Sequence, residues 1–142
     1  MIVGQIVERI RDQVPTLRRS VEPSLDIAGM VGDVVRAPVA YVAPTGDRGA
    51  PDLLVGDRMQ QVTRTIVVLL GLPSRNDKTG GNAVDDLEVL RTAVRSALHG
   101  WQPAGADSPC VYTGGRLAGL PAGAVWWAIT ISIDTYEDTE EP

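Results

Sequence analysis

The stretch Ala83–Pro103, AVDDLEVLRTAVRSALHGWQP, decides how this sequence folds. Its apolar residues recur three or four positions apart, the spacing that places side chains on one face of an α-helix: Val84, Leu87, Leu90, Val94, Ala97 and Leu98. Gly100 can adopt the left-handed conformation that ends a helix, and Pro103 prevents the helix from continuing. The stretch therefore predicts an amphipathic helix that packs one face on a partner layer and stops before Trp101.

Two shorter helices are expected earlier in the chain. Residues 2–14 have apolar side chains at helical spacing, and Pro15 ends the helix. Ser24 is a good N-cap for a second helix, which Gly29 and Gly32 keep short.

Four other stretches predict β-strands, at residues 39–43, 58–72, 109–113 and 124–136. Gly114 and Gly115 are expected to turn the chain so that residues 116–120 return beside residues 109–113. The polar stretches 44–57 and 73–81 predict loops. Beyond Thr65 both faces of the second strand are apolar, so we expect helices on one face and a neighbouring subunit on the other. The predicted fold class is α+β, a two-layer sandwich with a mainly antiparallel (mixed) β-sheet and two to three α-helices packed on one face.

Length and charge favour one domain with an acidic end. A chain of 142 residues predicts a single domain, residues 1–136, followed by an acidic and flexible tail, residues 137–142. The net charge is −5, and five acidic residues lie among the last nine. The remainder has balanced charge, which argues against a nucleic-acid-binding surface. A single cysteine and the lack of a signal peptide or membrane span favour the host cytoplasm.

No residue set predicts catalysis or metal binding. His99 is the only histidine, and its place in the last turn of a helix suggests that it complements the helix dipole. Lys78-Thr79 lacks the glycine spacing of a phosphate-binding loop. Asp85-Asp86 near a helix start is typical of dipole complementation rather than of a metal site. We therefore expect no enzyme activity, no cofactor and no metal.

The tryptophans are the best candidates for contacts. Trp101 is expected to pack over the helix end, with a role as an interface anchor as the alternative. Trp126 and Trp127 point to opposite faces of one strand. Trp127 shares its face with isoleucines, so replacing it with Ala should destabilise the fold. Trp126 should be exposed in a monomer, which makes it the candidate for a subunit contact.

The succession of motifs resembles the tail terminator proteins of long-tailed bacteriophages. The most specific parts are a helix that ends in Leu98-His99-Gly100-Trp101-Gln102-Pro103 and the later segment Tyr112-Thr113-Gly114-Gly115-Arg116-Leu117 before a closing strand. Within them Gly100, Trp101, Pro103, Tyr112, Gly114 and Gly115 form the structural signature. The resemblance extends from the N-terminal helix to Tyr136.

The resemblance implies a structural virion protein at the head-proximal end of the tail. Six copies would form a ring that caps the tail tube, stops its polymerisation and presents a surface for the head–tail connector. The partners would be the chain itself, the major tail tube protein and the connector, while genome DNA passes through the ring without sequence-specific binding. The tube or connector contacts would lie in loops 44–57 and 73–81, and assembly would occur in the host cytoplasm without a membrane.

Three alternatives stay open. The chain could be a head–tail connector, completion or minor tail protein of similar fold. It could be a small cytoplasmic enzyme with an unrecognised site, which would require a pocket with convergent polar groups. It could also be an adaptor that binds one partner as a monomer.

Overall fold

The computed structural model of the chain describes residues 2–32, 35–51, 59–74, 81–120 and 123–138. The helical elements are α1 (Ile2–Gln13), the 3₁₀ turn η1 (Pro15–Leu17), α2 (Ile27–Met30) and α3 (Gly81–Leu98). The strands are β1 (Val21–Pro23), β2 (Val39–Gly49), β3 (Met59–Pro73), β4 (Val111–Gly119) and β5 (Ala124–Asp138).

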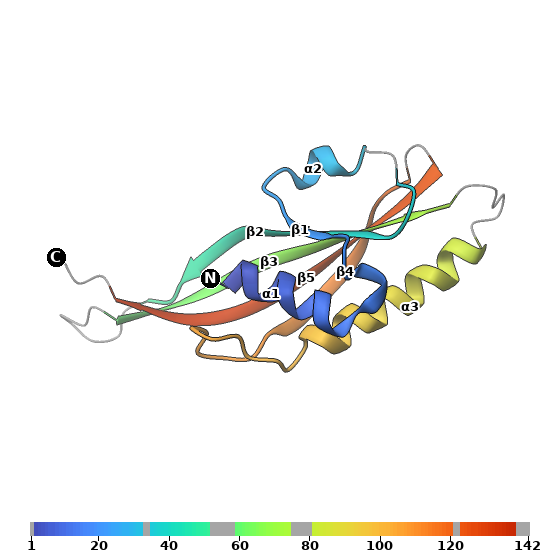
Figure 1. Cartoon of the computed structure of the whole chain (residues 1–142). Coiled ribbons are helices and arrows are strands. Elements are labelled where there is room, and N and C mark those ends of the chain that lie inside the picture. Colours follow the sequence, from blue (N-terminus) through green and yellow to red (C-terminus); the bar gives the residue numbers. More distant parts are fainter. Residues whose placement is uncertain (1, 33–34, 52–58, 75–80, 121–122, 139–142) are drawn as a thin grey trace.

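The strands form one five-stranded sheet in the order β1-β2-β3-β5-β4. β1 runs parallel to β2, and the other neighbouring pairs are antiparallel, so the sheet is mixed as predicted. β3 and β5 pair along their full lengths, from Met59 with Asp138 to Pro73 with Ala124. These two strands form the long axis of the molecule (Figure 1).

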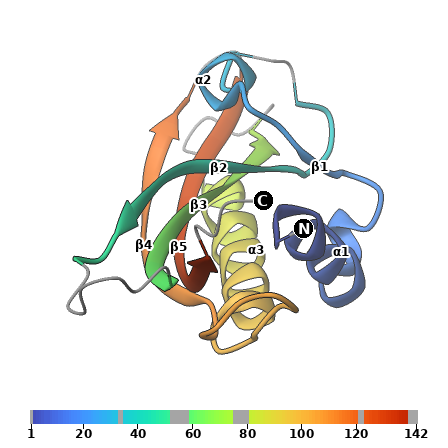
Figure 2. The ribbon, with the colours of Figure 1, turned by 90° about the vertical axis from the view of Figure 1, so that its left-hand side faces the viewer.

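α1 and α3 cover one face of the sheet, and the sheet curves around α3 (Figure 2). The core between these layers contains aliphatic side chains from the helices and from alternate positions of the strands, among them Ile6, Ile10, Val94, Leu98, Ile66, Leu70, Ile129 and Ile131. Each such side chain contributes about 1.5–3 kcal/mol when it is fully buried. The α+β sandwich with two helices on one face is therefore confirmed.

A smaller apolar cluster lies on the opposite face of the sheet. Its buried members are Val35, Leu69, Ala124, Trp126 and Ala128, and Ile27 and Met30 of α2 pack against it. α2 therefore lies on the other side of the sheet from α1 and α3 (Figure 1). We expected a neighbouring subunit to cover this face, and for this part of the face that expectation is wrong, because the chain's own residues cover it.

Three predicted boundaries are also wrong. β2 continues to Gly49, although residues 44–57 were predicted to be a loop, because residues 46–49 keep their pairing with β3 across a bulge. β4 is one continuous strand through Gly114 and Gly115, so these glycines do not form a turn. β5 continues to Asp138, two residues beyond the end of the strand predicted for residues 124–136, because β3 pairs with its whole length.

The ends of three strands extend beyond the helices. Figure 1 shows the last part of β2, the start of β3 and the end of β5 running past α1 and α3. Residues 44–49 of β2 are all exposed there. Of the predicted contact loops, 44–57 and 73–81, residues 52–57 and 75–80 lie outside the described residues.

Candidate functional site

The helix-ending segment is built into the edge of the sheet. Gly100 has a φ of 85°, the left-handed conformation predicted for the end of α3. Its N–H donates to the carbonyl of Cys110 at 2.8 Å, and the N–H of Cys110 donates to the carbonyl of Trp101 at 2.8 Å. These two bonds hold the segment beside the start of β4.

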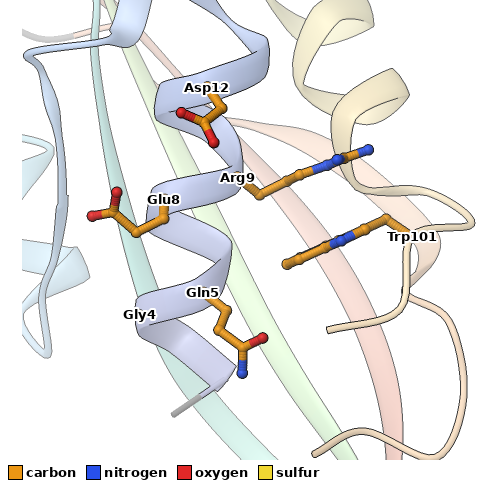
Figure 3. A pocket seen from close by; sticks show the side chains of 6 residues that line it. All are labelled: Gly4, Gln5, Glu8, Arg9, Asp12 and Trp101. Carbon is orange, nitrogen blue, oxygen red and sulfur yellow. The ribbon is translucent and has the colours of Figure 1, made fainter. Parts of the chain in front are cut away.

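Side chains of α1 bind the same segment from its other side. Gln5 makes two hydrogen bonds with the backbone of Ala104, both at 2.7 Å. The Arg9 Nε donates to the carbonyl of Ala97 at 2.9 Å, which satisfies a carbonyl in the last turn of α3. The Arg9 guanidinium also lies 5.2 Å from the centre of the Trp101 ring, a cation–π contact (Figure 3). Trp101 therefore packs across the junction of α1 and α3.

The pocket at this junction offers no convergent reactive groups. Its lining comprises Gly4, Gln5, Glu8, Arg9, Asp12 and Trp101. Figure 3 shows Glu8 pointing away from Trp101, and the Glu8 carboxylate pairs with Arg11 at 2.7 Å. Gln5 and Arg9 already bond to backbone carbonyls. Gln5 and Arg9 therefore serve to join elements of the fold.

His99 has a structural contact that the sequence did not predict. Its Nδ1 accepts the backbone N–H of Tyr112 at 3.1 Å, so the proton of the neutral ring lies on Nε2. The bond covers an edge N–H at the start of β4. Sequence reasoning had no signal for this contact, because it depends on how the residues after α3 meet β4.

Of the two signature glycines of β4, Gly115 has a packing role. A Cβ on Gly115 would lie 2.6 Å from Nε1 of Trp127 and 2.9 Å from the Tyr112 hydroxyl, so a side chain there would displace these rings. Gly114 lies at an irregularity in the pairing between β4 and β5, with no atom close to where its Cβ would be. The guanidinium groups of Arg91 and Arg95 each lie 5.4 Å from the centre of the Tyr112 ring.

The structure contradicts the reason for choosing Trp126 as a subunit contact. Trp126 and Trp127 do point to opposite faces, but Trp126 has no exposed surface. It lies beneath α2, Val31 and Val35, and the centre of its ring lies 6.3 Å from that of the stacked Tyr41 ring. Trp127 is partly exposed and packs on the edge of the larger core. Of the two tryptophans, Trp127 is therefore the one that a partner can reach.

The thiol of Cys110, the single cysteine of the chain, is buried. Burial raises the pKa of the Cys110 thiol to about 11, so the thiol is protonated at neutral pH. Among the described residues, no cluster of three or more His, Cys, Asp or Glu side chains is arranged to hold a metal ion. In the same ranges, no helix is both long enough and apolar enough to span a membrane.

Comparison with known proteins identifies the family. The family model described as phage tail terminator protein matches residues 1–137. A search of curated proteins finds no match for this sequence. The match extends over every helix and all but the last residue of the final strand. The chain therefore belongs to the phage tail terminator protein family, whose members are structural proteins of the bacteriophage tail.

Proposed function

We propose that six copies of this chain form a ring at the head-proximal end of the tail. The ring caps the tail tube, stops its polymerisation and presents the surface to which the head–tail connector attaches. The observation that carries this proposal is the family match over residues 1–137, which includes nearly all of the described fold.

The shape of the subunit supports assembly into a ring. The two edges of the sheet are unlike: β1, a three-residue strand beside α1, forms one, and β4, a nine-residue strand beside α3, forms the other. Contacts between unlike surfaces repeat head to tail, and they produce a closed ring when the rotation between copies closes. A capping ring can then bind the tube with one side and offer a different side to the connector.

Genome DNA would pass through the ring without sequence-specific contacts. The basic residues of the chain are balanced by acidic ones, and the excess negative charge lies at the C-terminal end. A surface that grips DNA needs clustered Lys and Arg side chains. The charge distribution therefore favours passage of DNA over binding.

Deleting the gene from the phage tests the proposal by electron microscopy of the resulting particles. We expect tails of uncontrolled length without attached heads, because the tube then lacks its cap. A plasmid copy of the wild-type gene should restore tails of uniform length joined to heads. Tails of normal length in the deletion phage would refute the capping role.

The same deletion experiment distinguishes the capping role from the alternative role of a head–tail connector protein. A connector protein would leave tail length unchanged and would bind to the portal side of the head. Normal tails that fail to attach to heads would therefore favour that alternative.

A further inference from the structure

An apolar groove lies between α3 and the edge of the sheet. Its apolar lining comprises Val84, Leu87, Leu117, Leu120, Val125 and Trp127, and its volume is about 530 Å³. Leu117 is 50% exposed, Val84 56% and Leu120 64%. Contiguous exposed apolar side chains of this kind mark interaction sites in soluble proteins. The groove uses residues at the end of β4 and the start of β5, on the same side of the sheet as α3.

The opposite edge of the molecule carries a projecting apolar side chain. Leu25, between β1 and α2, is 87% exposed, the largest value among the exposed large apolar residues that the structure describes. Its backbone is held in place on both sides. Ser24 donates its N–H to Val42 at 2.9 Å, and the Asp26 carboxylate accepts the N–H of Gly29 at 3.0 Å. A side chain presented by a fixed backbone loses little conformational freedom on binding.

Leu25 and the groove lie at opposite edges of the sheet. Leu25 borders a depression lined by Val3 of α1 and by Val42, which belongs to the core under α1 and α3. The groove borders the same core through Leu87 and Trp127. Four strand spacings separate β1 from β4, about 19 Å across the sheet. The two features therefore cannot meet within one molecule, but they can meet between two copies.

The charges beside the two features are complementary. Glu22 and Asp26, both exposed, flank Leu25. Arg91 lies on the rim of the groove together with Glu88, and Arg95 is exposed four residues further along α3. Within the described residues, neither of these two arginines has a carboxylate in salt-bridge distance, and both contact the ring of Tyr112. Complementary charge of this kind selects which surfaces meet and in which orientation.

We propose that Leu25 of one copy inserts into the groove between α3 and β4 of a second copy, with the acidic residues beside Leu25 facing the arginines beside the groove. The contact joins copies head to tail, and every copy uses both of its edges. This inference rests on the proposed ring and identifies the surfaces that build it.

A cysteine pair tests the contact directly. In the variant Leu25→Cys, Leu117→Cys, oxidation should join neighbouring copies into a ladder of covalent multimers on a non-reducing gel. Each single variant should remain monomeric on that gel, because its new cysteine has no partner. The native Cys110 is buried, so it does not compete. The matched control is Leu25→Cys, Val89→Cys, because Val89 is 73% exposed on α3 but lies outside the groove lining.

Three results would overturn the inference. A ladder of equal intensity in the Val89 control would show contact without specificity. Covalent dimers of either single variant would show that like surfaces meet. A wild-type assembly seen by native mass spectrometry, without a ladder from the Leu25–Leu117 pair, would show that the ring uses other surfaces. That last result would leave the capping role intact, since tail length measures the role separately.

A point variant gives a second readout. Leu25→Asp should raise the concentration needed for assembly by about tenfold or more, since an apolar side chain is lost from the contact. Its circular dichroism and thermal unfolding as a monomer should match the wild type, because Leu25 is almost fully exposed. Unchanged assembly of Leu25→Asp would contradict the inference.

Discussion

The two faces of the sheet are covered by very different amounts of secondary structure. Two helices, α1 and α3, cover one face and bury a large aliphatic core. The other face is covered by α2, a helix of four residues, and by Val35, over a cluster centred on Trp126. On each face a glycine of the neighbouring strand makes room for a tryptophan: Gly71 for Trp126 and Gly115 for Trp127. The short segment with α2 and Val35 buries Trp126 completely, whereas the face with the two longer helices leaves Trp127 partly exposed at the groove.

This difference shows that the amount of secondary structure on a face does not predict how much apolar surface stays exposed there. A short segment suffices where one large ring fills the space beneath it, because burial depends on the fit of side chains. Long helices can still leave an apolar groove where they diverge from the edge of the sheet. On this subunit the candidate contact surface is therefore on the heavily covered face.

The largest expected effect follows from replacing Trp126. We expect Trp126→Ala to lower the free energy of unfolding by about 3–5 kcal/mol, because the fully buried ring leaves a cavity. Trp127→Ala is the matched control, and we expect a loss of about 1–2 kcal/mol because part of its ring is already exposed. Urea denaturation of both variants measures the difference. A larger loss for Trp127→Ala would contradict the assignment of the covered face.

A smaller effect is expected from filling the space beneath Trp126. A Cβ on Gly71 would lie 2.6 Å from the Trp126 ring, so Gly71→Ala should displace the ring and cost about 1–3 kcal/mol. Gly114→Ala is the control, since no atom lies within 4 Å of its Cβ position. Thermal unfolding should separate the two variants, together with a change in the near-ultraviolet circular dichroism of Gly71→Ala. Equal stability would mean that the ring is not packed on Gly71.

The smallest expected effect on stability concerns Cys110, which belongs to the core on the face covered by α1 and α3. Burial raises the thiol pKa from 9.0 to about 11, so above pH 9 the unfolded chain releases the proton that the folded chain retains. Stability should therefore fall as the pH rises from 9 to 11, and remain unaffected by this group below pH 9. Urea denaturation across this range should show a smaller fall in Cys110→Ala. In the native protein at pH 8, the thiol should not react with a thiol reagent until urea unfolds the chain.

Periodicity and end signals predicted most of the elements. The apolar stripe of residues 2–14 predicted α1, and Gly100 with Pro103 predicted the end of α3, because these signals act within one or two helical turns. Alternation along residues 124–136 predicted β5 and the opposite orientations of Trp126 and Trp127. The strand ends were predicted less well: β2 and β5 are longer than expected because pairing with β3 extends them.

The contacts of the site were harder to predict, because they too depend on residues that are far apart in the chain. The signature residues from Gly100 to Gly115 were identified in the sequence, but their contacts were not. The bonds of Gln5 with Ala104 join residues 99 positions apart, and His99 meets the backbone of Tyr112 only after β4 enters the sheet. No local pattern encodes such pairs.

By itself the sequence determined the fold class, the main helices, the face of each tryptophan and the family to which the chain belongs. These properties follow from local spacing and from the order of motifs. Only the tertiary structure decided that Trp126 is covered by its own chain, that Gly115 is needed for the Trp127 ring, and that Leu25 and the groove lie at opposite edges. Each of these depends on distances between residues far apart in the chain, which are set when the layers pack.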